Sequence, residues 1–181
     1  VVAFGSRVLD KSEPKYMNSS ETPVYSKRRV LYGLNLAKKS KRPNIILCEG
    51  NLDIVTLHQA GFDNAVASMG TALTPEQIRL LSRFTKELVL CYDNDNAGKI
   101  ATERALQLLN GSEFSVKVLQ LPRRRTEDGE LVKQDADDFI KNQGPAAFER
   151  LLSGSENGVE FRMAQVAGKY DLDSDEQRVA Y

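Results

Sequence analysis

From residue 44 onward, short apolar runs alternate with segments of helical spacing, and this alternation constrains the fold more than any other feature of the chain. In chain order, the runs and helical segments are 44–50, 52–60, 65–68, 74–84, 87–93, 97–109 and 114–122. A continuous apolar run is typical of a strand that is buried on both faces. Strands that alternate with helices at this spacing predict an α/β fold, with a mostly parallel sheet covered by helices on both faces.

Two helix signals are specific enough to test individually. Thr74, Pro75 and Gln77 match a capping box with proline at the first helical position. Gly98 lies just inside the expected helix 97–109, where glycine costs about 1 kcal/mol relative to alanine. We expect the close approach of a ligand or strand to explain it. Further along, RRRTEDGE at 123–130 predicts an exposed turn.

Carboxylates follow the strand-like segments at the points where a parallel sheet binds its ligands. These acids are Glu49, Asp93 and Asp95, and the later motif that contains Asp135 and Asp137. Ligands bind beyond the carboxyl ends of such strands, so the acids are expected at one edge. Two carboxylates about 4 Å apart repel by several kcal/mol at an effective dielectric constant near 20. A divalent cation relieves that repulsion, and oxygen ligands without His or Cys favour Mg²⁺ or Mn²⁺.

Any one of these acids has a simpler interpretation as a helix cap. Asp53, Asp95 and Asp137 all lie near expected helix starts, where carboxylates are favourable in any case. For Asp53 this interpretation is the preferred one. The two cysteines, Cys48 and Cys91, lie inside apolar runs with no metal-binding partner at suitable spacing. They predict buried reduced thiols, and no zinc is expected in this chain.

The charges are distributed unevenly along the chain. The formal net charge is zero, but residues 1–43 contain ten Lys and Arg against three Asp and Glu, which leaves +7 in this part and −7 in the rest. A basic arm and an acidic body suggest a phosphate polymer and metal, although ordinary solvated surface explains the charges as well. Tyr16 and Tyr25 are candidates for stacking on bases, whereas Tyr32 lies in an apolar pattern and is expected in the core.

The composition and the ends of the chain set broader limits. The 181 residues are 41% hydrophobic, and no run approaches the roughly 18 apolar residues that a membrane span needs. We therefore expect no membrane association and a cytoplasmic location. The chain opens at Val1 in a strand-like run and closes on an incomplete helical pattern after about residue 154. It is expected to be a fragment of a longer protein.

Three segments resemble the TOPRIM domain, whose marks are a strand-end EG and a strand-end DxD: CEGNLDIVTLHQAG (48–61), ASMGTALT (67–74) and CYDNDNAGKIA (91–101). More specifically, PKYMNSSETPVYSKRRVLYGLNLAKK (14–39) resembles the basic stretch before this domain in bacterial DnaG-type primases. The resemblance spans about residues 1–150. It implies a Rossmann-like TOPRIM domain at 44–142, preceded at 1–43 by part of a basic α+β subdomain. The start of a C-terminal helical subdomain is implied at 143–181.

The resemblance also implies an enzyme, a DNA primase that makes short RNA primers on a DNA template by metal-dependent nucleotidyl transfer from nucleoside triphosphates (NTPs). It implies Mg²⁺ or Mn²⁺ at Glu49, Asp93, Asp95, Asp135 and Asp137, the first three of which are also catalytic. The implied partners are single-stranded DNA, NTPs, the RNA primer and a replicative helicase that binds a region outside this chain. The implied location is the bacterial cytoplasm, at the nucleoid and replisome.

In the basic part, Arg7, Lys15, Asn18 and Lys27 match positions that face nucleotide and template in the family. The sequence departs from the family pattern in three places. Asn51 stands where an aromatic residue is common, and Asn94 stands where glycine is common. The common DPD motif here reads DAD at 135–137, after an unusually long charged insertion, RRRTEDGELVK, at 123–133.

Two other functions fit the same acids. One is a TOPRIM phosphodiester enzyme, either a nuclease or a topoisomerase fragment, although a topoisomerase needs an active-site tyrosine that the sequence gives no reason to assign. The other is a binding module for metal and nucleotide that is inactive in this truncated form. Whether the fragment is active alone does not follow from the sequence.

Overall fold

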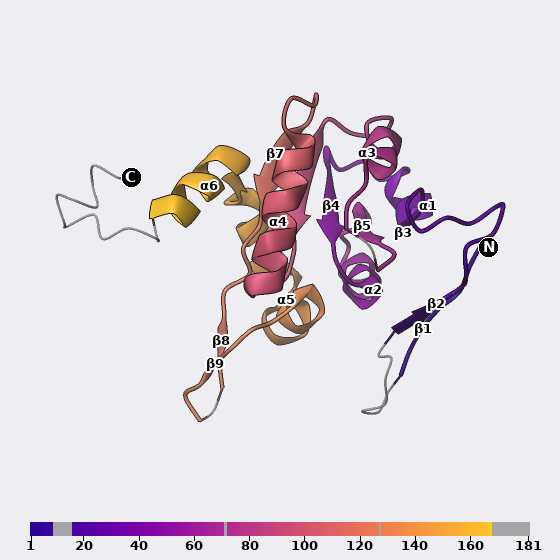
Figure 1. Ribbon diagram of the computed structural model, residues 1–181. Coiled ribbons are helices and arrows are strands. Elements are labelled where there is room, and N and C mark those ends of the chain that lie inside the picture. The colour runs from indigo at the N-terminus through magenta and orange to yellow at the C-terminus, as the bar shows by residue number, and fades with distance from the viewer. Residues whose placement is uncertain (9–15, 71, 127, 168–181) are drawn as a thin grey trace.

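The computed structural model describes residues 1–8, 16–70, 72–126 and 128–167. A six-stranded sheet in the order β10–β7–β6–β4–β5–β3 forms its centre (Figure 1). The four inner strands are parallel: β4 (Asn44–Cys48), β5 (Ala65–Ser68), β6 (Glu87–Cys91) and β7 (Ser115–Val118). The edge strands β3 (Leu31–Tyr32) and β10 (Glu156–Asn157) are antiparallel to their neighbours. The mostly parallel sheet predicted from the alternating pattern is confirmed.

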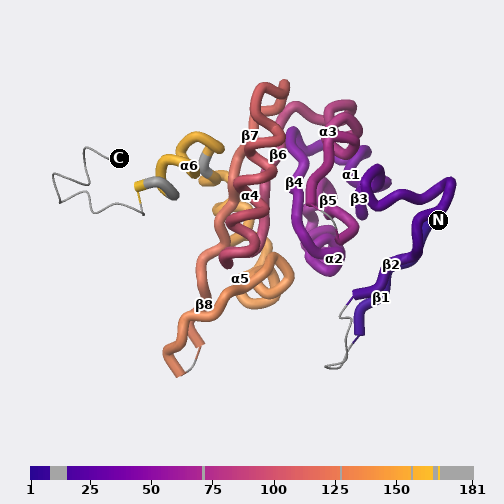
Figure 2. Tube along the Cα trace, in the orientation of Figure 1, coloured from indigo at the N-terminus to yellow at the C-terminus, as the bar shows by residue number. Residues whose placement is uncertain are grey.

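Helices cover both faces of this sheet, as predicted. They are α1 (Leu34–Ala37), α2 (Asn51–Gln59), α3 (Pro75–Leu81), α4 (Asn96–Leu109), α5 (Ala136–Ser153) and α6 (Gly158–Ala167). Strand residues alternate between the faces, so Ile46 packs with α2 and α5 while Leu47 packs with α3 and α4. Figure 2 shows α4 running along the sheet in this way.

Helix α5 is fixed against the sheet by aromatic packing. The ring of Phe148 lies 4.8 Å from that of Phe62 and 6.1 Å from that of Phe139, both edge-on. All three side chains are almost fully buried. Edge-on pairs at such separations are favourable beyond the area they bury. This cluster holds the start of α5, with its acidic motif, close to α2.

The predicted capping box of α3 is present. The Thr74 hydroxyl accepts from the Gln77 amide, and the Gln77 side chain accepts from the Thr74 amide, both at 3.1 Å. Gln77 also donates to the carbonyls of Lys27, at 3.1 Å, and Val30, at 2.9 Å. The capping residues therefore tie the basic stretch to the start of α3.

Two short hairpins were not predicted, although the first strand of one lies in the opening run that looked strand-like. One pairs β1 (Gly5–Arg7) with β2 (Tyr16–Asn18), and the other pairs β8 (Arg124–Arg125) with β9 (Leu131–Val132). The second replaces the simple turn expected at 123–130. Its strands are too short and too polar to produce a hydrophobic period. In Figures 1 and 2 both hairpins extend beyond the same end of the sheet, where α4 begins.

Two of the tyrosine predictions were wrong. Tyr25 is 1% exposed and belongs to the core, so its ring is not available for stacking on bases. Tyr32, expected in the core, is 39% exposed. It lies in the edge strand β3 beside Leu31, and because successive strand residues face opposite ways, Leu31 takes the buried position.

Strand β3 comes from the predicted basic subdomain and β10 from the predicted C-terminal subdomain, yet both pair with the central sheet. The predicted boundary at 142/143 falls beside a kink in α5 at Gly144, whose φ is 79°. Both boundaries stay predictions. In the described part of the chain, no helix combines the length and apolar character that a membrane span requires.

Candidate metal and nucleotide site

The first group of acids lies where β4 and β6 end. Register places Cys48 opposite Cys91, and both thiols are buried, as predicted. Glu49 directly follows β4, and its carboxylate accepts a 3.4 Å hydrogen bond from the backbone amide of Asp93. Parallel pairing therefore brings the acids of two strand ends, 44 residues apart in the sequence, into contact.

Gly98 explains how the Asp93–Asp95 turn is held. A Cβ atom at this position would lie 2.0 Å from the carbonyl oxygen of Asp93, so only glycine fits. The Asp95 carboxylate caps α4 by accepting from the Gly98 amide at 2.8 Å. A close approach is present, as expected, but the approaching group is the backbone of the turn after β6 and not a ligand or strand.

A cation lies among these acids that the sequence reasoning did not single out. The Lys133 ammonium, at the end of the β8–β9 hairpin, is 2.7 Å from Asp95 Oδ2 and 3.8 Å from Asp93 Oδ2. Its hydrogen bond, followed by that of the Gly98 amide, lowers the pKa of Asp95. Burial, and then the charge of Asp93, raise the pKa of Glu49. Lys133 belongs to the long charged insertion at 123–133, and the sequence contains no pattern that places this insertion beside the acids.

The second group of acids lies at the start of α5. Asp135 caps this helix by accepting from the Asp138 amide at 2.8 Å. Carboxylate oxygens of Asp135, Asp137 and Asp138 lie within 4.8 Å of one another. Among the described residues, no other group of acids lies close enough together to hold a metal ion in this way. Burial, and then the charges of Asp135 and Asp137, raise the pKa of Asp138. Asp138 was not among the predicted ligands, whereas Glu49, Asp93 and Asp95 are not gathered this tightly.

Asp137 is the most strongly bound acid of this second group. Burial acts to raise the pKa of its carboxyl, but hydrogen bonds from Lys141, at 2.6 Å, and from the Thr56 hydroxyl outweigh burial and lower it. Both oxygens therefore have partners from α2 and α5. A metal ion that used Asp137 would have to replace one of them.

Asp53 connects the two groups of acids. It is 7% exposed and accepts from the backbone amides of Gly50, at 3.2 Å, and Asp137, at 3.1 Å. Burial, and then the charge of Asp135, raise its pKa to about 7. Asp53 does lie in the first turn of α2, as its helix-cap interpretation required. No local pattern indicated that this residue also reaches the start of α5.

The donor set fits a divalent ion of the magnesium class. Every candidate ligand is a carboxylate oxygen, which is the ligand type that Mg²⁺ and Mn²⁺ prefer. The Lys133 ammonium among the first acids also shows that this position already accommodates a cation. An ion here would be held by Glu49, Asp93 and Asp95, with the α5 acids beside them.

Of the predicted basic and polar residues, Arg7 has a described interaction with these acids, whereas Asn18 and Lys27 have other partners. After the hydrogen bonds already named, the charge of Arg7 also lowers the pKa of Asp137, and the Arg7 guanidinium lies 5.4 Å from the Tyr16 ring. Asn18 donates to the Met69 carbonyl, just beyond β5, at 3.4 Å. The Lys27 backbone amide is held by Glu21 at 2.8 Å. Lys15 lies outside the described residues.

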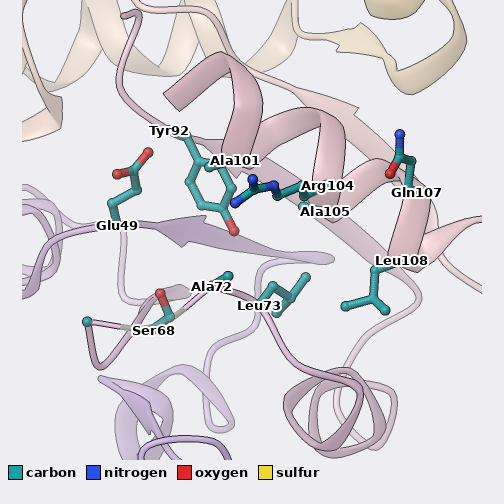
Figure 3. A pocket seen from close by; sticks show the side chains of 11 residues that line it. Glu49, Ser68, Ala72, Leu73, Tyr92, Ala101, Arg104, Ala105, Gln107 and Leu108 are labelled. Carbon is teal, nitrogen blue, oxygen red and sulfur yellow. The ribbon is translucent and has the colours of Figure 1, made fainter. Parts of the chain in front are cut away.

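A cavity of about 660 Å³ opens beside the first acids, between α4 and the segment that follows β5. Figure 3 shows Glu49 at one end of it and Leu108 at the other, with Tyr92 and Arg104 between them. Burial, and then the charge of Glu49, raise the pKa of Tyr92. The cavity thus joins a partly apolar space to the acidic edge.

Comparison with known proteins assigns the family. A model described as Toprim-like matches residues 46–140, and a model of the N-terminal domain of the DNA primase catalytic core matches residues 1–38. A DNA primase from Clostridium acetobutylicum is 40% identical over 182 residues, which cover 100% of this chain and 29% of that relative. This chain belongs to the DNA primase family of Toprim proteins.

Solved primase structures share the fold. A crystal structure of a DNA primase domain from Pseudomonas aeruginosa, 34% identical, superposes with a TM-score of 0.83 over 99% of this chain and 55% of that one. The RNA polymerase domain of the Mycobacterium tuberculosis primase, solved with double-stranded DNA, is 35% identical and superposes with a TM-score of 0.81. The match covers 99% of this chain and 57% of that one. The chain spans about three-tenths of the curated primases it matches.

Proposed function

We propose that this chain forms the catalytic centre of a bacterial primase, which synthesises short RNA primers on a DNA template for replication. The supporting observation is that one sheet edge carries acids from two parallel strand ends, Glu49 and Asp93–Asp95, beside the acids of α5, in a chain of the primase family. The reaction is nucleotidyl transfer from NTPs, and the enzyme is a DNA-directed RNA polymerase.

The cofactor is Mg²⁺ or Mn²⁺, held by Glu49, Asp93 and Asp95, with Asp135 and Asp137 as further ligands. When bound, a divalent ion neutralises the triphosphate and activates the attacking 3′-hydroxyl. The Asp95 carboxylate is oriented by the hydrogen bond from Gly98 to Oδ1, so Oδ2, which now accepts from Lys133, is the oxygen that would bind the ion. Glu49 either completes the metal site or acts as the general base that accepts the proton released by the 3′-hydroxyl.

The basic arm holds the polyanionic partners. The triphosphate and the single-stranded template are bound by Arg7, Lys15, Asn18 and Lys27, and the product is the RNA primer. Solved relatives include a primase catalytic domain bound to single-stranded DNA, which supports a DNA template. A replicative helicase binds the complete protein through a region outside this chain. The site of action is the replisome in the bacterial cytoplasm.

Metal binding tests the site. In the chain as it stands, the double variant Asp93→Ala/Asp95→Ala should stay folded and lose most of its affinity for Mn²⁺ in calorimetry, because it removes two of the three first-group carboxylates. A double variant of exposed acids, Glu113→Ala/Glu149→Ala, removes the same formal charge and should bind as the parent does. Equal Mn²⁺ affinity in parent and Asp93→Ala/Asp95→Ala would remove these acids from the metal site.

Primer synthesis tests the activity. The chain replaces the matching stretch of the Clostridium acetobutylicum relative, and the chimera receives single-stranded template, NTPs and Mn²⁺. RNA primers are expected from the chimera and from its Glu113→Ala/Glu149→Ala form, and not from its Asp93→Ala/Asp95→Ala form. A folded chimera that makes no primers would contradict the primase proposal. Cleavage of the template would then indicate a nuclease, and relaxation of supercoiled DNA a topoisomerase. Nucleotide binding without turnover would indicate a binding module.

A further inference from the structure

The β8–β9 hairpin delivers one cation to the proposed metal site. Lys133 follows β9 directly, and its ammonium lies 2.7 Å from Asp95 and 3.8 Å from Asp93. The charge of Lys133 also acts on Glu49. It therefore interacts with all three acids of the first group. This arrangement differs from an ordinary surface ion pair, since its partners come from the strand ends that carry the proposed chemistry.

The base of the hairpin is fixed close to the acids. The Gln134 side chain, buried next to Lys133, donates to the Pro122 carbonyl at 2.6 Å and so closes the base of the hairpin. On the other side, Asn94 donates from the Asp93–Asp95 turn to the Leu121 carbonyl at 3.0 Å. The backbone of Lys133 is thus held relative to the turn that carries its two carboxylate partners.

The side chain of Lys133 is free to leave while its backbone stays. It is 59% exposed, and Asp93 and Asp95 are about one-third exposed. A divalent ion bound to the same oxygens would repel the ammonium, so the two cations exclude each other there. Displaced from the carboxylates, the ammonium remains on a tethered side chain a few ångströms from the ion.

We propose that Lys133 is a further nucleotide-binding cation of this site, in addition to those of the basic arm: it pairs with Asp93 and Asp95 until a divalent ion displaces it, and it then binds the triphosphate of the NTP. This inference rests on the proposed function. A metal-bound triphosphate still carries negative charge, and an ammonium on a flexible stem is a standard partner for phosphate oxygens. Lys133 therefore weakens the binding of the free divalent ion and strengthens the binding of the ion–nucleotide complex.

The two roles predict effects of opposite sign from one substitution. Lys133→Met keeps the length of the side chain and removes the charge. Calorimetry of the 181-residue chain with Mn²⁺ alone should show about threefold to fivefold tighter binding, the range expected when an exposed ion pair no longer competes. With GTP at saturating Mn²⁺, affinity should fall about tenfold or more, as expected for loss of a charged hydrogen bond.

Two further variants complete the experiment. Lys86→Met removes an equally exposed lysine whose partner is Glu113, away from these acids, and should leave both affinities unchanged. Lys133→Arg keeps the charge and should restore most of the GTP affinity. Unchanged Mn²⁺ affinity or unchanged GTP affinity in Lys133→Met overturns the inference while the metal site stands. Mn²⁺ affinity that also survives Asp93→Ala/Asp95→Ala overturns the proposed site itself, and the inference with it.

Discussion

At the scale of single residues, Asp53 carries the largest electrostatic cost near the site. Its carboxyl is buried, accepts two backbone hydrogen bonds and lies near the charge of Asp135. Two amide donors favour the ionised form, yet burial and a like charge outweigh them and raise the pKa to about 7. Asp53 therefore joins α2 to α5 most favourably when protonated.

This pKa predicts the direction of a pH effect on stability. The folded state holds the Asp53 proton up to about pH 7, whereas the unfolded state releases it near its ordinary pKa of 3.8. The stabilisation of the folded state by the Asp53 proton is therefore complete below the unfolded pKa of 3.8, and it is lost as pH rises through about 7. From about pH 5 to pH 8, the free energy of unfolding of the metal-free parent, measured in urea, should fall by about 2 kcal/mol more than that of Asp53→Asn.

The control for this prediction is Asp128→Asn, which removes an exposed carboxylate and should follow the parent at every pH. The comparison between parent and Asp53→Asn isolates one residue, because all other titrating groups are common to both. Parallel stability profiles for these two proteins would show that Asp53 is ionised in the folded state throughout.

Gly98 gives a second prediction at the residue scale. Gly98→Ala gains about 1 kcal/mol of helix propensity but places a Cβ atom 2.0 Å from the Asp93 carbonyl oxygen. The clash should dominate, with a net loss of about 2 kcal/mol in the free energy of unfolding, in line with other overpacked sites. Weaker Mn²⁺ binding should accompany it, because the Asp93–Asp95 turn has to move.

Gly154→Ala is the matched control, since the nearest atom to its Cβ would be at an ordinary contact distance of 3.6 Å. It should change stability by less than about 0.5 kcal/mol and leave Mn²⁺ binding intact. A Gly98→Ala protein as stable as the parent would mean that the turn accommodates a side chain and that glycine is not required there.

At the scale of elements, the start of α3 links the basic stretch to the Toprim sheet. Gln77 is fully buried, completes the capping box and donates to two carbonyls of the segment 27–30. The Thr74 hydroxyl adds a 2.7 Å bond to the Arg28 carbonyl. One helix start therefore satisfies its own backbone and that of a segment about 50 residues earlier in the chain.

Gln77→Ala should accordingly destabilise the chain by about 2–3 kcal/mol, because it leaves two partly buried carbonyls and a helix-start amide without partners. Backbone amides around 27–30 should exchange with deuterium faster than in the parent. Gln107→Ala, an exposed glutamine on α4, should do neither. If exchange around 27–30 is the same in Gln77→Ala and parent, other contacts hold the basic stretch in place.

At the scale of the whole molecule, the fold sets a basic arm against an acidic sheet edge. The arm should bind single-stranded DNA by releasing counterions, so affinity should fall as salt rises. With about four phosphates neutralised, the slope of log affinity against log salt should be near −3. Lys27→Ala/Arg29→Ala should reduce the slope by about 1.4, as measured by fluorescence anisotropy over a salt series.

A double variant with the same charge change, Lys86→Ala/Lys117→Ala, should keep the parent slope, since those lysines pair with Glu113 and Glu87 away from the arm. A flat salt dependence in the parent would exclude phosphate contacts by the arm. The same slope in all three proteins would show that DNA lies elsewhere on the molecule.

The parallel core and the strand-end acids follow from local patterns in the sequence. Buried strands such as 44–48 need continuous apolar runs, and helix caps such as Thr74 need particular side chains next to them, so both leave local marks. The basic stretch at 14–39 carried enough local detail to indicate the primase family, which the comparisons then confirmed. Gly98 marked a close approach for the same reason.

The groups that surround those acids follow instead from contacts between distant parts of the chain. Lys133 reaches Asp95 from 38 residues away, and Asp53 reaches the Asp137 amide from 84 residues away. Neither contact produces a periodic pattern in the sequence, because each depends on how a hairpin or helix packs across the sheet edge. The exposure of Tyr32 was decided likewise, by the pairing of β3 at the edge of the sheet. Local patterns specify elements, whereas charge neutralisation and burial arise from contacts between elements distant in the chain.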